Sequence, residues 1–272
     1  MSFAALFVRG LETTDDRQIL AYRGLTQGAM VALVACVIRG ISPSQFLRSL
    51  DRVDWTAGVA MAFAFGLYIF SLLNTSVAST LLILSIAPVF AAVLSWLWIG
   101  EKPTVVTWTS IALALCGVAV MVGAGLDLGR TTGNLLAIGS ALSFALMLVL
   151  ARGSGKPDLL GGNFLGAVIA MAVMAGLALA GSDTGLTVSR YDLLLLLTMG
   201  AFTIGLGIAF VAWAAPNLPA AEVSLLILLE SVLSPLWVWI FLGEKMSFYE
   251  ITGGIMLLAS VAMLVSMQRQ VA

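Results

Sequence analysis

Histidine is absent from this sequence of 272 residues, and charged residues make up only 10% of it. The missing imidazole removes the side chain that ordinarily titrates near neutral pH and a common metal ligand. Only two cysteines occur, Cys36 and Cys116, and both lie within apolar runs, where a thiol behaves as a small hydrophobic group. These scarcities argue against a histidine-based triad, a zinc or haem centre and a disulfide framework. We therefore expect no metal and no cofactor.

Apolar residues, by contrast, are in large excess. Hydrophobic side chains account for 61% of the chain, against about 45–50% in soluble domains. The 13 Lys and Arg residues nearly balance the 14 Asp and Glu residues, and the charges fall mostly between apolar runs without forming a basic face. Nucleic acid is therefore not an expected partner. The composition predicts an integral membrane protein whose main surroundings are the lipid bilayer.

The apolar residues are grouped into runs long enough to cross a membrane. A bilayer core of roughly 30 Å requires about 20 residues of helix, and helices satisfy their own backbone hydrogen bonds in lipid. Short connectors rich in glycine, proline and charge separate the runs. The sequence predicts an all-α polytopic membrane protein with nine spans, at 22–38, 55–73, 77–99, 105–124, 134–151, 162–181, 191–214, 219–242 and 247–267.

The first residues do not fit this pattern. Residues 1–8 are apolar, but a helix of that length covers only about 12 Å of the membrane core. Two interpretations stay open. The segment is either a short interfacial stretch or the end of a first transmembrane helix whose beginning is missing from this chain.

An internal repeat gives the sequence its organisation. The tripeptide Gly-Glu-Lys begins at Gly100 and again at Gly243, an offset of 143 residues (243 − 100), and several matches, such as Trp96 with Trp239, share that offset. Residues 1–124 and 134–267 are predicted to form two five-helix units joined by residues 125–133, the first helix being truncated. An odd number of helices inverts the second unit relative to the first, an architecture that holds substrate near the membrane midplane. Chance similarity between apolar helices is the alternative explanation.

The chain resembles the EamA-type members of the drug/metabolite transporter superfamily. The resemblance is carried by the duplicated helix, Gly-Glu turn and helix, and by the segment LPAAEVSLLILLE from Leu218 to Glu230. It implies ten helices, two five-helix halves around a central cavity, and a multi-pass protein of the bacterial inner membrane. It also implies export of a small solute such as an amino acid, a nucleoside, a drug or another metabolite.

Two glutamates in the predicted span 219–242 are candidate sites for substrate binding or proton coupling. Glu230 follows Pro219 by eleven residues, about 16 Å along a helix and near the membrane centre. An acid at that depth ordinarily faces a cavity or a partner helix. Glu230 is predicted to bind a polar or cationic part of the solute or to exchange a proton, the alternative being a protonated side chain bonded to a neighbouring helix. Glu222 lies near the start of the span, where the helix dipole favours a carboxylate whatever the function.

Two prolines occupy corresponding spans of the two halves. Pro88 and Pro235 each remove a backbone hydrogen bond and are predicted to kink their helices. Ser85 and Ser231 lie close to these kinks and are candidates for the cavity lining. Serine and proline are also ordinary packing elements of membrane helices, and that alternative stays open for each residue.

Several further polar residues lie in or beside the spans. Tyr68 is deep enough to offer its hydroxyl to a solute, and Asn74 is an amphipathic residue at the end of a span. Glu101 and Glu244, in the repeated turns, are interpreted as turn elements or gate-closing ion-pair formers, with the neighbouring lysines as partners. Exposed pairs of that kind contribute about 0–1 kcal/mol.

The leading functional hypothesis is a secondary transporter that alternates access by rocking two halves around a midplane cavity. An intramembrane hydrolase would need a nucleophile with a base or paired aspartates. The predicted spans contain a single aspartate, Asp192 at the edge of span 191–214, and the chain has no histidine. A non-transporting membrane scaffold, or an inactive truncated relic, is the remaining alternative.

Overall fold

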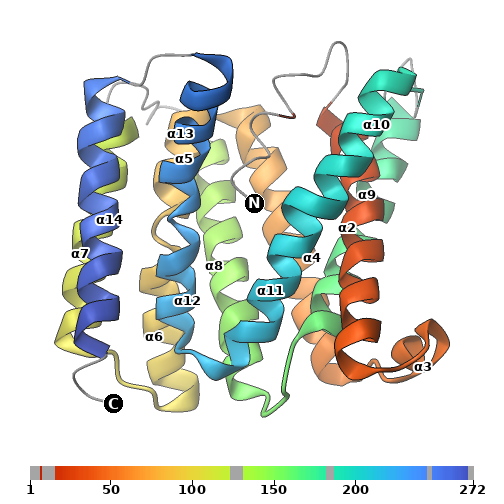
Figure 1. Ribbon diagram of the computed structural model, residues 1–272, viewed down its shortest axis with the longest axis horizontal. Helices are drawn as coiled ribbons and strands as arrows, with labels where there is room; N and C mark the ends of the chain where they lie inside the picture. Colours follow the sequence, from red (N-terminus) through yellow and green to blue (C-terminus); the bar gives the residue numbers. More distant parts are fainter. Residues whose placement is uncertain (1–6, 8–15, 123–130, 182–186, 244–246, 269–272) are drawn as a thin grey trace. The chain divides into compact units, whose positions relative to one another are not determined.

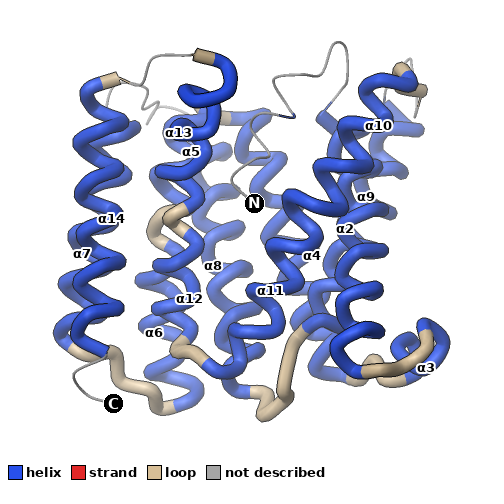
Figure 2. Tube along the Cα trace, viewed as in Figure 1, coloured by secondary structure: helices blue, strands red, loops and turns tan. Residues whose placement is uncertain are grey.

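The described part of the chain consists of helices joined by short loops and turns, and it contains no strand (Figure 2). The computed structural model describes residue 7 and residues 16–122, 131–181, 187–243 and 247–268. All but one residue of the predicted stub 1–8 therefore lies outside the described residues. Backbone contacts divide the chain into unit 1, which is Met1–Phe63 with Lys156–Ala214, and unit 2, which is Ala64–Gly155 with Ala215–Ala272. Each unit draws residues from both halves of the sequence.

The predicted membrane-spanning character is confirmed. Eight helical segments within the described residues are long and apolar enough to cross a bilayer, and they correspond to eight of the nine predicted spans: Gln18–Arg39, Arg52–Ser71, Ser79–Ile99, Val105–Val122, Thr131–Gly153, Leu160–Ala180, Arg190–Asn217 and Phe248–Ser266. The ninth predicted span, 219–242, is divided between α12 (Ala220–Ile227) and α13 (Glu230–Leu242).

Unit 1 is organised around α2 (Asp16–Arg39) and α9 (Leu160–Gly181), which pack against each other. The short α3 (Pro43–Arg48) and the start of α4 (Arg52–Asn74) follow α2 along the chain. A Cβ atom at Gly166 of α9 would lie only 2.7 Å from the Met61 Cβ of α4. A small residue at this position therefore lets the two helices approach closely, as is common in membrane proteins.

The last span of unit 1 contains a widened helical turn. It runs through α10 (Arg190–Thr198), the π-helical segment η1 (Met199–Gly205) and α11 (Leu206–Ala214), and both α10 and η1 contact α2. A π-helical turn inserts an extra residue into the helix and changes which side chains face the neighbouring helix.

Unit 2 contains a closely packed pair of helices. Figure 1 shows α7 (Val105–Val122) and α14 (Phe248–Gln268) running alongside each other, and their contact is extensive. A Cβ atom at Gly117 would lie 2.7 Å from the backbone oxygen of Gly253. These two glycines let the backbones of α7 and α14 meet directly.

The other helices of unit 2 are α5 (Val77–Leu84), α6 (Ala87–Ile99), α8 (Thr131–Gly153), the 3-10 turn η2 (Ala215–Asn217), α12 and α13. The α5–α6 segment is interrupted at residues 85–86, and the α12–α13 segment at residues 228–229. These interruptions are 143 residues apart (228 − 85), which is also the offset of the sequence repeat.

The two interruptions share one hydrogen-bond feature. The amide of Ile86 donates to Ile83 O at 3.1 Å, and the amide of Leu229 donates to Leu226 O at 3.1 Å, so both segments tighten to bonds that reach back three residues. Both segments then end at a glycine in the left-handed region, Gly100 with φ 77° and Gly243 with φ 69°. The repeated sequence thus folds into a repeated local structure within unit 2.

Candidate functional site

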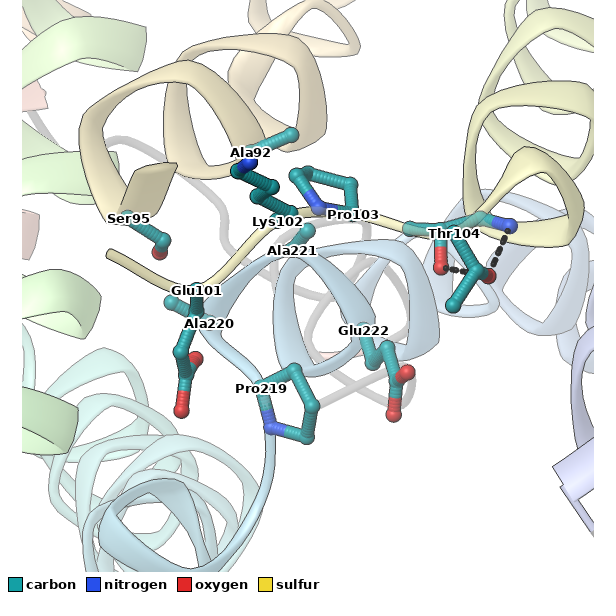
Figure 3. A pocket seen from close by; sticks show the side chains of 11 residues that line it. Ala92, Ser95, Glu101, Lys102, Pro103, Thr104, Pro219, Ala220, Ala221 and Glu222 are labelled. Carbon is teal, nitrogen blue, oxygen red and sulfur yellow. Dashed lines mark hydrogen bonds between the residues drawn. The ribbon is translucent and has the colours of Figure 1, made fainter. Parts of the chain in front are cut away.

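A pocket lies where the end of α6, the α6–α7 turn and the start of α12 meet (Figure 3). We call it the α6–α12 pocket. Its volume is about 280 Å³, and every lining residue belongs to unit 2: Ala92, Ser95, Glu101, Lys102, Pro103, Thr104, Thr107, Pro219, Ala220, Ala221 and Glu222. Alanine and proline form its apolar walls, and the two glutamates, one lysine and three hydroxyls supply its polar groups.

Glu222 is the predicted site residue that lines this pocket. It is the third residue of α12, and only 8% of it is exposed. Its backbone amide donates to Pro219 O at 3.0 Å, within the first turn of the helix. Pro219, at the helix start, has no side-chain donor or acceptor that could cap the first turn. Because Glu222 belongs to that first turn, its carboxylate lies near the positive end of the α12 dipole.

Glu101 takes part in an ion pair across unit 2. Its Oε1 accepts from Arg152 Nε at 2.6 Å, and Arg152 also donates through Nη1 to Pro216 O at 2.8 Å. The partner of Glu101 is therefore Arg152, at the end of α8, and not the adjacent Lys102 that the turn sequence suggested. The side chains of Glu101 and Arg152 are about 30% exposed (30% and 29%), so the pair is partly shielded from solvent. Glu244, in the second turn, lies outside the described residues.

Glu230 does not line the α6–α12 pocket, but it occupies a distinctive position. It is the first residue of α13, it directly follows the interruption at residues 228–229, and it is half-buried. The next residue, Ser231, is also half-buried, and its amide donates to Leu228 O at 3.0 Å. The interruption thus places the Glu230 carboxylate at the start of a helix inside a predicted span.

The α5–α6 and α12–α13 segments differ in where the proline lies relative to the interruption. Ser85 is 1% exposed, and its hydroxyl donates to Leu82 O at 2.5 Å, the carbonyl whose usual amide partner is diverted to Ile83. Pro88 follows as the second residue of α6. Pro235 lies inside α13, seven residues after the interruption at 228, and its side chain is outside the described residues.

Tyr68 and Asn74 lie elsewhere in unit 2. Both belong to α4, where Tyr68 is half-buried. Asn74 is the exposed last residue of that helix, and its side-chain amide donates to Phe70 O at 2.7 Å. Neither residue lines the α6–α12 pocket.

Unit 1 contains a cluster of charged side chains that the sequence analysis did not predict as a site. Lys156 Nζ donates to Asp51 Oδ1 and to Asp54 Oδ2, each at 2.7 Å, and Asp54 is only 1% exposed. The hydrogen bond from Lys156 lowers the pKa of Asp51 from 3.8 to about 2. Burial lowers the pKa of Lys156, but its bonds to the two aspartates outweigh this and raise it above the usual value.

A second ion pair in unit 1 includes Asp158, two residues after Lys156 in the sequence. Arg39, the last residue of α2, donates to Asp158 through Nε at 3.2 Å and through Nη2 at 2.5 Å. Its guanidinium carbon also lies 5.7 Å from the ring centre of Phe46 in α3. Paired bonds of this kind fit the planar arginine fork, which lysine cannot reproduce. The pair connects the end of α2 to the segment before α9.

Over the described residues, these features are those of an all-helical, multi-pass membrane protein with a repeated interrupted-helix motif and a pocket that contains carboxylates. The chain belongs to the EamA-like transporter family, whose family model matches residues 1–123 and 131–266. Family membership makes it a membrane transporter by class, and it identifies no enzymatic activity.

The chain is also similar to one curated protein in sequence and to one solved structure in fold. The "Uncharacterized transporter YvbV" of Bacillus subtilis (strain 168) is 42% identical over 71 residues, which are 25% of this chain and 23% of that protein. The match thus spans about a quarter of this curated relative. A solved structure described as "Crystal structure of protein" superposes with a TM-score of 0.83 at 18% identity, over 98% of this chain and 94% of the other. That similarity establishes the fold.

Proposed function

We propose that this protein is a secondary transporter that exports a small metabolite or drug-like solute by alternating access between its two sequence repeats. Membership of a transporter family supports the class, and one observation supports a polar or cationic solute. Glu222, only 8% exposed, brings a carboxylate to a pocket of about 280 Å³ between the end of α6 and the start of α12.

The energetic argument rests on what a carboxylate costs in this setting. An ionised side chain among membrane helices is expensive unless it meets a partner, a proton or water, and such residues mark solute and proton pathways. The first-turn position in α12 lowers that cost through the helix dipole. It also holds the carboxylate at the pocket wall, which suits repeated binding and release.

Glu230 is the second residue that we propose for solute binding or proton exchange. The interruption at residues 228–229 gives it a helix start of its own inside the span. Interrupted helices with half-helix ends near the midplane are a recurrent way to build transporter binding sites. We propose that Glu222 and Glu230 act at successive positions along the α12–α13 segment.

Solute accumulation in everted membrane vesicles tests this proposal. Radiolabelled amino acids, nucleosides and cationic drugs are offered to vesicles with the full chain and to vesicles from cells without it. For a transported solute, Glu230→Gln is expected to lower the initial rate about tenfold or more, since a charge-assisted hydrogen bond contributes about 1.5–3 kcal/mol.

Glu250→Gln provides the matched control. Glu250 is the third residue of α14, its carboxylate accepts from the Ser247 amide at 2.6 Å, and it does not line the pocket. This variant removes a first-turn carboxylate but is expected to leave the rate unchanged. Full, proton-dependent transport by Glu230→Gln would refute the role of Glu230. Absence of transport of every solute would favour a membrane scaffold instead.

A further inference from the structure

The α6–α12 pocket contains two polar atoms that the protein itself leaves without a partner. Ser95 is 3% exposed, and its Oγ has no hydrogen-bond partner. Glu101 Oε2 is also buried without a partner, although Oε1 of the same carboxylate is held by Arg152 at 2.6 Å. Buried polar atoms in native proteins nearly always have a hydrogen-bond partner, so each exception indicates that a bound partner is missing from the site.

The backbone holds these two residues in a fixed relation. The amide of Glu101 donates to Ser95 O at 3.3 Å, and the amide of Gly100 donates to the same carbonyl. Gly100 makes this turn possible because its φ of 77° lies in the left-handed region. In the view of Figure 3, Ser95 and Glu101 lie on one side of Pro219 and Glu222 lies on the other.

The chemistry of the unpartnered atoms selects the missing group. A carboxylate oxygen accepts hydrogen bonds and donates none, so the partner of Glu101 Oε2 must be a donor. A serine hydroxyl can accept from the same donor group. The other acidic lining residue, Glu222, is buried, whereas Lys102, the cation among the lining residues, is exposed. Water screens the charge of Lys102 more strongly than the buried carboxylates.

We propose that the α6–α12 pocket binds the protonated primary amine of a solute, with Ser95 Oγ and Glu101 Oε2 as hydrogen-bond acceptors and the Glu222 carboxylate as a further negative charge in the pocket wall. An ammonium group has three N–H donors and can serve both acceptors at once. The alanine and proline walls suit the carbon atoms next to it. The volume of about 280 Å³ lies just below the usual range for ligand pockets, about 300–1,000 Å³, and fits a small aliphatic amine or one end of a larger solute.

This inference rests on the proposed transport function, because it names the solute class that the transporter would take. It also assigns Ser95 and Glu101 to the binding site. The pocket binds its ligand whether or not a transport cycle follows, so binding can be tested apart from transport.

Thermal unfolding of the purified full chain in detergent measures this binding. The probes are propylammonium chloride, tetramethylammonium chloride and 1-propanol, titrated at constant ionic strength. Propylammonium is expected to raise the unfolding midpoint in a saturable way. Tetramethylammonium carries the charge without N–H donors, and 1-propanol carries a donor without the charge, so both are expected to leave the midpoint unchanged.

Three variants locate the site. Ser95→Ala is expected to raise the apparent Kd for propylammonium about tenfold, through loss of one hydrogen bond to a charged group. Glu222→Gln is expected to abolish the shift, and it decides the question if Ser95→Ala does not fold. Ser110→Ala is the matched control, since Ser110 is fully buried with an unpartnered Oγ but does not line the pocket, and its Kd should match the wild-type value.

The possible outcomes separate the two proposals. No saturable shift with propylammonium, equal shifts with tetramethylammonium or 1-propanol, or a Ser95→Ala titration identical to wild type would each overturn the amine site. If solute transport is found in vesicles under any of those outcomes, the transporter proposal stands. If propylammonium binds as expected and no solute is transported, the amine site stands and the transport proposal fails.

Discussion

Removing Arg152 should destabilise the protein more than removing its ion-pair partner Glu101. Arg152 makes two bonds, through Nε to Glu101 Oε1 at 2.6 Å and through Nη1 to Pro216 O at 2.8 Å. Exposed ion pairs contribute about 0–1 kcal/mol, and breaking a buried pair costs about 3–5 kcal/mol. With about 30% of each side chain exposed (29% and 30%), we expect a coupling energy of about 1–2 kcal/mol between these values.

The bond to Pro216 makes the two single variants unequal. Glu101→Ala leaves that bond intact and also removes a carboxylate oxygen that has no partner. Arg152→Ala loses both bonds, so its cost should exceed that of Glu101→Ala by about 1.5–3 kcal/mol, the contribution of a hydrogen bond from a charged donor.

A double-mutant cycle on denaturant unfolding in mixed micelles measures both quantities. Arg48→Ala serves as the control, because Arg48 is exposed at the end of α3 and its removal should change stability by about 0.5 kcal/mol or less. Equal costs for the two single variants, or a coupling energy of zero, would refute this account of the α6–α7 turn.

Three further outcomes are expected. Gly117→Ala should lower stability by about 1–3 kcal/mol, because the new Cβ would lie 2.7 Å from a backbone oxygen of α14, whereas Gly66→Ala, with nothing within 4 Å, should cause no loss in the same unfolding assay. Asp51 has a pKa of about 2 against 3.8 in the unfolded chain, so its contribution is present above pH 3.8 and lost as the pH falls through 2. Because Asp51 is half-exposed, Asp51→Asn should cost about 1 kcal/mol or less at pH 6 and nothing below pH 2, as compared by unfolding midpoints. Ser85→Ala should cost about 1 kcal/mol in the same assay, since a carbonyl at the interruption loses its 2.5 Å hydroxyl partner.

The membrane helices could be predicted from the sequence because their cause is local. Apolar runs of about 20 residues need no distant partner to become helices in lipid. The repeated glycine of the Gly-Glu-Lys sequence was equally readable, because α6 and α13 both end at a glycine in the left-handed region, Gly100 and Gly243. The interruptions at 85–86 and 228–229 could not be placed from the prolines, because Pro88 lies two residues after the end of the first (88 − 86) but Pro235 lies six residues after the end of the second (235 − 229).

The candidate site was harder to predict because it depends on contacts between distant segments. Glu222 was a sequence candidate, but the partner of Glu101 is 51 residues away, and the adjacent Lys102 offered a misleading local alternative. Nothing in the sequence distinguishes Ser95 from any other serine of an apolar helix. The available signal was that Ser95 precedes Glu101, in the Gly-Glu-Lys turn, by six positions. Only the fold shows that Ser95 and Glu101 line one pocket.

The same limit applies to the ionic cluster in unit 1. Lys156 meets Asp51 and Asp54 across more than 100 residues, with separations of 105 and 102. Charges in connectors between spans give no indication of such pairing, because most connector charges are solvated. The class of protein can therefore be predicted from the composition, whereas the candidate site is recognised only in the tertiary structure.

The most direct test of the central claim compares two first-turn glutamates in proteoliposomes. Glu222 and Glu250 are each the third residue of a helix, but only Glu222 lines the pocket. For the solute identified in vesicles, the initial transport rate of Glu222→Gln should fall about tenfold or more below wild type, while Glu250→Gln keeps the wild-type rate. Equal rates for the two variants would show that the pocket carboxylate takes no part in transport.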